Sequence, residues 1–241
     1  MTRAASEALT KASRRAGLGA SAAQPVSVTA DPPRDCPACP RLAAFRDQWR
    51  LAEPGWFNAP VPTFAAPDET VALLVVGLAP GLRGANRTGR PFTGDYAGDL
   101  LYATLTARGL ARGRFAASPD DGLQLVRSAI TNAVRCVPPE NKPTGAEIAA
   151  CRPWLAATIA RFPALVAMVA LGRVAHETVL SAAGLPRARA PFSHGGEHDL
   201  PGGIRLFDSY HCSRYNTNTG RLTEPMFHAV FDRVVQHIGP A

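Results

Sequence analysis

The stretch GLAPGLRGANRTGRPFTGD, from Gly77 to Asp95, follows the apolar run Val71–Val76 and begins where a buried strand is expected to end. Glycine-rich loops in this position often bind phosphate. A P-loop would continue from its second glycine into Lys and then Ser or Thr, whereas Gly89 is followed by Arg90 and Pro91. The stretch contains no Gly-x-Gly-x-x-Gly either. Its composition therefore argues against a nucleoside triphosphate or a dinucleotide as the ligand.

Apolar runs and helical patterns alternate after residue 70. Strands are predicted at 71–77, 125–134, 164–172 and 203–211, and helices at 97–109, 144–162, 173–184 and 223–239. Thr144 and Glu147 have the spacing of a capping box, and Thr223 is the expected cap of the last helix. This alternation predicts an α/β fold with three layers, in which a central four-stranded parallel sheet has helices on both faces.

The N-terminal part of the chain differs in composition from the rest. Residues 1–30 are rich in Ala and Ser and basic, which predicts a disordered tail, with a transit peptide as the alternative. Residues 31–70 contain many prolines, and we expect an irregular arm wrapped on the domain. The predicted organisation is a tail at 1–30 and one catalytic domain at 31–241.

Charge and cysteine content restrict the class of protein. The 241 residues carry a net charge of +7 and a pI of about 9.6, which favours an anionic partner such as nucleic acid. The 24 arginines against two lysines also fit a bias in base composition. No apolar run approaches the roughly 18 residues of a membrane span, and no secretory signal is evident. We expect a soluble protein of a reducing cytoplasm.

Four of the five cysteines have a spacing that suits a metal centre. Cys36 and Cys39 form a C-x2-C pair, and Cys136 and Cys151 follow in C-x14-C spacing. Thiolates suit zinc or an iron–sulfur cluster, although four unrelated buried thiols remain an alternative. A base deaminase is excluded because its His-x-Glu would precede the pair, and the first histidine is His176.

Polar residues follow two of the predicted strands. Asn132 lies near the end of one strand, where an Asn is often a turn former but can also read a planar amide edge. His211 leaves the last strand and leads into a loop that carries Arg214, Tyr215 and Asn216. A solvated loop is the alternative interpretation there.

These motifs together resemble those of the uracil-DNA glycosylase superfamily. GLAPG, NRTGRPFTGD, TNAVRC and HCSRYNTNTG occur in the order of that family, and the resemblance runs from about Asp35 to the C-terminus. The leucine of GLAPG and the SRYNTNTGRLT segment are similar to family 5, the B type. The four cysteines match the iron–sulfur centre of families 4 and 5.

The resemblance implies a DNA glycosylase of base excision repair. Such an enzyme hydrolyses the N-glycosidic bond of a flipped-out uracil, and here of other deaminated or oxidised bases as well. It also implies a [4Fe–4S] cluster on the four cysteines, DNA as the partner, a monomer, and a cytoplasmic, nucleoid-associated location. The alternative function is a noncatalytic iron–sulfur or zinc module that binds nucleic acid.

The resemblance also implies roles for individual residues. Phe92 would stack on the base, Asn132 would hydrogen-bond its edge, and His211 would donate to the oxygen on which negative charge grows. Asp95 would polarise water or balance the positive sugar. The predicted DNA-binding residues are Arg214, Tyr215 and Asn216, and the other predicted substrate-binding residues are Gly77, Leu78, Ala79 and Gly81.

The chain departs from the wider superfamily in its first motif. Families 1 and 4 have an acid at the position of Leu78, so the water-activating role passes to Asp95. A pocket without that polar group should accept a wider range of bases. Cys212 stands where a proline is common, and it is the unpaired fifth cysteine.

Overall fold

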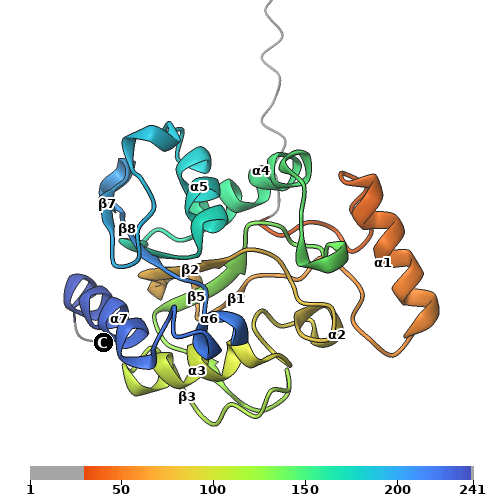
Figure 1. Ribbon diagram of the computed structural model, residues 1–241, viewed down its shortest axis with the longest axis horizontal. Coiled ribbons are helices and arrows are strands. Elements are labelled where there is room, and N and C mark those ends of the chain that lie inside the picture. Colours follow the sequence, from red (N-terminus) through yellow and green to blue (C-terminus); the bar gives the residue numbers. More distant parts are fainter. Residues whose placement is uncertain (1–29, 240–241) are drawn as a thin grey trace, which may run out of the picture.

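A computed structural model describes residues 30–239, and a six-stranded sheet runs through their middle in the order β1-β5-β2-β6-β8-β7 (Figure 1). Its four central strands are parallel and almost fully buried, as expected for apolar runs covered on both faces. They are β2 (Leu73–Gly77), β5 (Ser128–Asn132), β6 (Ala167–Leu171) and β8 (Arg205–Ser209). All four predicted strands are therefore confirmed.

Two short edge strands make the sheet mixed rather than purely parallel. β1 (Phe64–Ala65) pairs antiparallel with β5, and β7 (Glu197–Asp199) pairs antiparallel with β8. Strands of two or three residues have no measurable periodicity, which is why the sequence predicted four strands only. A separate small hairpin joins β3 (Ala111–Arg112) to β4 (Gln124–Leu125).

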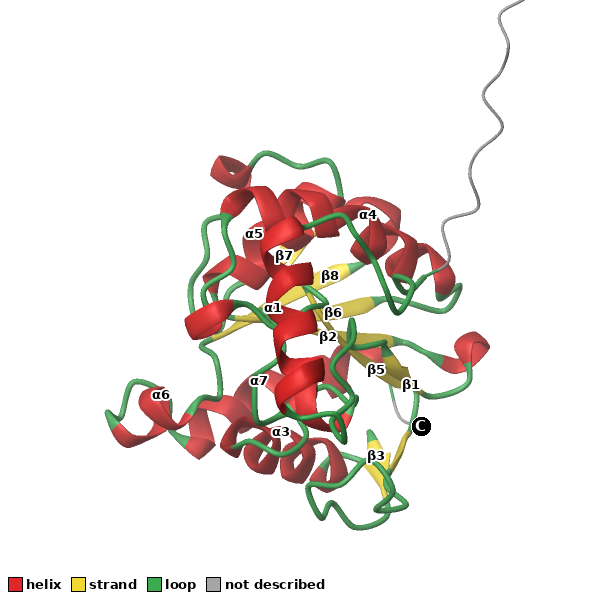
Figure 2. Ribbon diagram, turned by 90° about the vertical axis from the view of Figure 1, so that its right-hand side faces the viewer, coloured by secondary structure: helices red, strands yellow, loops and turns green. Residues whose placement is uncertain are grey.

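Helices cover both faces of the sheet, so the predicted three layers are confirmed. α4 (Gly145–Arg161) and α5 (Arg173–Ala182) lie on one face, and α3 (Tyr96–Ala107) and α7 (Glu224–Ile238) lie on the other (Figures 1 and 2). The capping box of Thr144 and Glu147 is present. Within 30–239, no helix is long and apolar enough to cross a bilayer.

Short helical segments complete the fold. Two are α-helical, namely α2 (Ala85–Thr88) and α6 (Arg214–Asn218). The 3-10 segments are η1 (Asp68–Thr70), η2 (Pro139–Asn141), η3 (Arg187–Arg189) and η4 (Pro201–Gly203).

The prediction of an irregular arm at 31–70 is wrong in part, because it contains the helix α1 (Pro40–Ala52), which lies at one side of the sheet (Figure 1). Pro40 occupies the first turn, where a missing N–H costs nothing. Leu42 and Arg46 are its only fully buried residues, so its apolar pattern is weak. The predicted tail lies outside the described residues, apart from Ala30.

The register of the central strands gathers their carboxyl ends at one edge. Gly77 at the end of β2 pairs with Asn132 at the end of β5, and Leu171 of β6 pairs with Ser209 of β8. Within the sheet, β5 lies next to β2 on one side and β6 lies next to it on the other, so the direction in which strands are added reverses at β2. Ligands of such sheets bind in the crevice at this kind of reversal.

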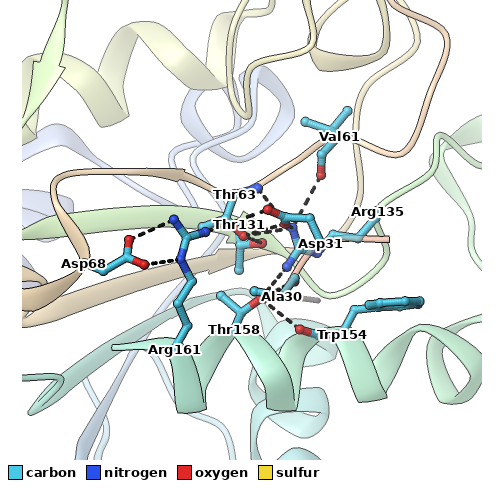
Figure 3. Close-up of polar contacts among 10 residues, drawn as sticks. All are labelled: Ala30, Asp31, Val61, Thr63, Asp68, Thr131, Arg135, Trp154, Thr158 and Arg161. Carbon is cyan, nitrogen blue, oxygen red and sulfur yellow. Dashed lines mark hydrogen bonds and ion pairs between the residues drawn. The ribbon is translucent and has the colours of Figure 1, made fainter. Parts of the chain in front are cut away.

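A buried guanidinium joins the N-terminal arm to the sheet. Arg135 follows β5 and is 1% exposed, and Figure 3 shows its head group between the arm and α4. Nearby, Arg161 of α4 makes a bidentate ion pair with Asp68 at 2.7 and 2.8 Å. Arg135 donates hydrogen bonds to Asp31 Oδ1 (2.7 Å), Thr63 Oγ1 (2.9 Å), Thr158 Oγ1 (2.7 Å) and the Val61 carbonyl (3.4 Å).

Replacing this guanidinium should destabilise the fold. We expect Arg135→Met to lower the free energy of unfolding by about 3 kcal/mol, because it leaves several buried polar partners without a donor. Urea unfolding followed by circular dichroism measures the change. Lys142→Met is the control, since Lys142 pairs with Glu140 in full solvent exposure and should leave the midpoint unchanged. Equal midpoints for both variants would contradict the role of Arg135.

Candidate active site

A pocket of about 350 Å³ opens at the carboxyl edge of the central strands. That volume suits a small ligand such as a single base with its sugar. The loops after β2, β5 and β8 all contribute to its wall. Of the predicted residues, it is lined by Leu78, Ala79, Gly81, Phe92, Asp95, Asn132, His211 and Arg214.

Phe92 forms part of the pocket wall, and its backbone is strained. Its φ of 51° lies in the left-handed region, which is uncommon for a bulky residue. The loop is fixed on both sides, because the Tyr102 hydroxyl donates to the Pro91 carbonyl at 2.7 Å and Arg90 Nε donates to Thr93 Oγ1 at 2.8 Å. Arg90 in turn makes a bidentate pair with Asp121. The surrounding structure therefore holds the ring in one position.

Gly77 is not among the lining residues, but it packs closely against two of them, Phe92 and Asn132. A Cβ at this position would come within 2.6 Å of the Phe92 ring and 2.5 Å of Asn132 Oδ1. Only a glycine lets the strand end approach both side chains so closely. Asn132 is 3% exposed and lines the pocket, with its Oδ1 atom packed close to the Gly77 backbone.

Asp95 brings a carboxylate into the pocket at the start of α3. Burial raises its pKa, although the backbone N–H groups of Gly98 and Ala97 act in the opposite direction. Within residues 30–239, its buried Oδ1 atom has no hydrogen-bond partner. A carboxylate oxygen that is desolvated and unpaired is costly, unless it is kept for a substrate or for water.

His211 lies beside the Phe92 ring, with ring centroids 5.9 Å apart and an angle of 27° between the planes. Enclosure by the protein lowers its pKa to about 4. The imidazole is therefore neutral at neutral pH, and one of its nitrogens carries a hydrogen that can be donated.

The segment after His211, expected as a loop, contains the short helix α6 and forms the rim of the pocket. Arg214 lines the rim and its guanidinium lies over the Tyr96 ring, 5.1 Å from the centroid. Tyr215 does not line the pocket and is 73% exposed. The Asn216 side chain donates to the His211 carbonyl at 2.8 Å, so in this structure it fixes the loop.

Several lining residues were not predicted from the sequence. Tyr96 and Ala97 directly follow Asp95, so the motif could have included them. Asn141 is on a different loop, after β5, and no motif or periodicity indicated it. The other unpredicted lining residues are Pro80, Ala85 and Ser213.

Cys36, Cys39, Cys136 and Cys151 line a second, smaller cavity between the start of α1 and α4. None forms a disulfide. Burial raises the pKa of Cys39 to about 11 and that of Cys136 to about 12, and neighbouring thiols add to both effects. The backbone N–H of Arg135 points at the Cys151 sulfur at 3.3 Å. Cys212 is separate and fully buried, with its Sγ 3.4 Å from the Ala97 carbonyl oxygen.

A second group of potential metal ligands is tied together by hydrogen bonds. His176, His198 and Asp208 place their ligand atoms within 4.8 Å of one another, and no three cysteine sulfurs in 30–239 do so. Asp208 lies 2.7 Å from His176 Nδ1 and 3.0 Å from His198 Nε2, while His176 Nε2 donates to the Ala190 carbonyl. These contacts fasten the segment before β7 to β8, away from the pocket.

Comparison with known proteins agrees with this arrangement. The family described as the Uracil DNA glycosylase superfamily matches residues 64–235. A type-5 uracil-DNA glycosylase of Thermus thermophilus is 46% identical over 199 residues, which cover 80% of this chain and 89% of the relative. Proteins of the same name from Mycobacterium leprae (44%; 81% and 88% covered) and Pyrobaculum aerophilum (38%; 85% and 90% covered) are also similar. With its pocket at the carboxyl edge of an α/β sheet, this chain belongs to the uracil-DNA glycosylase superfamily.

Proposed function

We propose that this chain hydrolyses the bond between a flipped-out uracil and its deoxyribose in DNA, as an enzyme of base excision repair. The observation that carries the proposal is the half-buried Asp95 carboxylate, whose buried Oδ1 has no hydrogen-bond partner within residues 30–239, in a pocket that also holds Phe92, Asn132 and His211. The name shared by the relatives supports it. No observation favours the alternative of a noncatalytic nucleic-acid module.

The base would lie against Phe92 with its edge toward the Asn132 amide. An aromatic face is large and rigid, and an amide can donate to one atom of the base and accept from another. In the reaction the bond from C1′ to the base nitrogen breaks, and its electron pair leaves with the base. Negative charge then grows on the base oxygen, where the neutral His211 ring can donate its N–H.

Asp95 would act on the sugar side of the same bond. Its carboxylate can orient a water toward C1′, accept a proton as the new C–O bond forms, and offset the positive charge of the sugar. Leu78 lines the pocket without offering a second carboxylate. We therefore assign water activation to Asp95 alone. An apolar side chain at Leu78 also makes the pocket less selective for one pattern of donors, so other deaminated or oxidised bases are included in the proposed substrate range.

The pocket mouth would contact the DNA backbone. Arg214 and Tyr215 lie on or next to the rim, in the short helix α6, which is capped by Ser213, whose side chain accepts from the Asn216 N–H at 3.4 Å. An arginine and an exposed aromatic ring are suited to enter the space from which a nucleotide has been displaced. We propose that the enzyme works as a monomer in the cytoplasm.

We propose further that the four cysteines of the second cavity hold a [4Fe–4S] cluster. They line one cavity between segments far apart in sequence, and their donor set is purely thiolate. A tetrahedral zinc with Zn–S bonds of about 2.3 Å needs sulfurs only about 3.8 Å apart, whereas no three cysteine sulfurs among residues 30–239 lie within 4.8 Å of one another. When bound, the cluster would cross-link α1 to α4 and to the end of β5.

The cluster is tested on protein prepared without air. We expect about four irons and four sulfides per chain, because four cysteines hold a cluster of that size. Cys151→Ser should lose the visible absorption, whereas Cys212→Ser should keep it, since Cys212 lies outside the cavity. Stoichiometric zinc without sulfide would contradict the proposal.

The role of Asp95 is tested by single-turnover kinetics. Asp95→Asn should slow release of uracil by about 100-fold or more, because the amide can orient water but carries no charge. The loss should be similar for a deaminated purine, since the sugar is common to both substrates. Asn132→Ala, by contrast, should slow the release of uracil more than the release of the purine. An Asp95→Asn variant with wild-type rates would place water activation elsewhere.

The pH dependence of the rate should separate the two titratable groups. His211 has its pKa lowered to about 4, so it stays neutral above that pH and the pH–rate profile should show no descending limb near pH 6.5. Asp95 must be ionised, and its pKa is raised, so the rate should fall with acid above the range of an ordinary Asp. That limb should disappear in Asp95→Asn. A limb near pH 6.5 that His211→Gln abolishes would contradict a neutral imidazole.

A further inference from the structure

A residue outside the four sequence motifs lines the rim of the pocket. Asn141 belongs to the turn between β5 and α4, and its side chain is exposed at the pocket mouth. Among the described residues, its amide has no hydrogen-bond partner. An amide with free donors at the mouth of a pocket is available to a ligand.

The backbone of this turn is strained at two successive residues. Glu140 and Asn141 have φ values of 55° and 56°, in the left-handed region. The left-handed conformation costs roughly 1–2 kcal/mol for a residue with a Cβ, and Asn tolerates it better than most. Strain of this kind persists only where the surroundings impose it, and it concentrates at functional sites.

The contacts that hold this turn in its strained conformation also connect it to the cysteine cavity. The Arg41 guanidinium, two residues after Cys39, donates to the Lys142 carbonyl at 3.1 Å and makes a bidentate pair with Glu147 at 2.8 Å. Glu147 also accepts from the Thr144 N–H in the capping box of α4. Inside the turn, the Asn141 N–H donates to the Pro138 carbonyl at 3.2 Å. The turn therefore cannot relax without moving α1 or α4.

We infer that the Asn141 side chain donates a hydrogen bond to a backbone phosphate next to the flipped nucleotide. Phe92 and Asn132 are buried in the pocket lining, whereas Asn141 is exposed, so a base held by the first two leaves its sugar and phosphate toward Asn141. The neighbouring carboxylate of Glu140 is paired with Lys142 at 3.1 Å. An amide N–H is a good donor to a phosphate oxygen. This inference rests on the proposed function.

The first test compares two glycine variants of the same turn. Asn141→Gly removes the amide and relieves the left-handed strain, so the protein should fold. Glu140→Gly relieves the same strain but keeps the amide. We expect Asn141→Gly to weaken binding of duplex DNA with a non-hydrolysable uridine analogue by about tenfold, the scale of one hydrogen bond to a charged group. Glu140→Gly should bind at least as tightly as the wild type. Asn141→Asp should bind more weakly than Asn141→Gly, because a carboxylate repels phosphate.

The second test identifies the phosphate. A methylphosphonate is placed on the 5′ or the 3′ side of the uridine analogue, and affinities of wild type and Asn141→Gly are measured for each. At the contacted position, the loss of affinity caused by the methylphosphonate and the loss caused by Asn141→Gly should not add, since either change removes the same hydrogen bond. Additive losses at both positions, or wild-type affinity of Asn141→Gly, would overturn the inference. A wild-type protein that releases no uracil would instead overturn the proposed function.

Discussion

The burial of one positive charge determines how the segments of this protein meet. The Arg135 guanidinium has its pKa lowered by burial, while the carboxylate of Asp31 opposes that effect. Charges are kept in a protein interior only with partners on several sides, and here the partners come from the arm and from α4. Arg135 also lies between Asn132, which faces the pocket, and Cys136, which faces the cysteine cavity. The same few residues after β5 therefore fix the arm, the pocket and the thiols relative to one another.

The pocket has an asymmetric distribution of charge. Burial raises the pKa of Asp95 and lowers that of His211, so His211 is neutral at neutral pH, while the proposed reaction uses Asp95 in its ionised form. The depth of the pocket thus holds a single negative charge, and the positive charge of Arg214 is at the rim. An anion such as a triphosphate would be repelled from this interior, whereas a sugar that becomes positive would be stabilised. The glycine-rich loop after β2 serves close packing around Asp95, since a Cβ at Gly81 would come within 2.9 Å of Asp95 Oδ2.

Much of this architecture could be predicted because long apolar runs and helix caps are local signals. The parallel strands, the cap at Thr223 and the gathering of Asn132 and His211 at one edge all follow from such patterns. α1 was missed because few of its residues are buried, and the edge strands were missed because they are too short. The left-handed backbone of Phe92 and the position of Asn141 depend on contacts with distant segments, which no local pattern records.

The position of the four cysteines along the chain has a consequence for biosynthesis. Cys36 and Cys39 leave the ribosome well before α4, which carries Cys151. The cavity that they line exists only after β5 has paired with β2, because Cys136 follows β5. The proposed cluster therefore requires the first two thiols to stay reduced while the centre of the sheet is synthesised and folds. Oxidation of Cys36 and Cys39 in this interval would leave the cavity without two of its four thiolates.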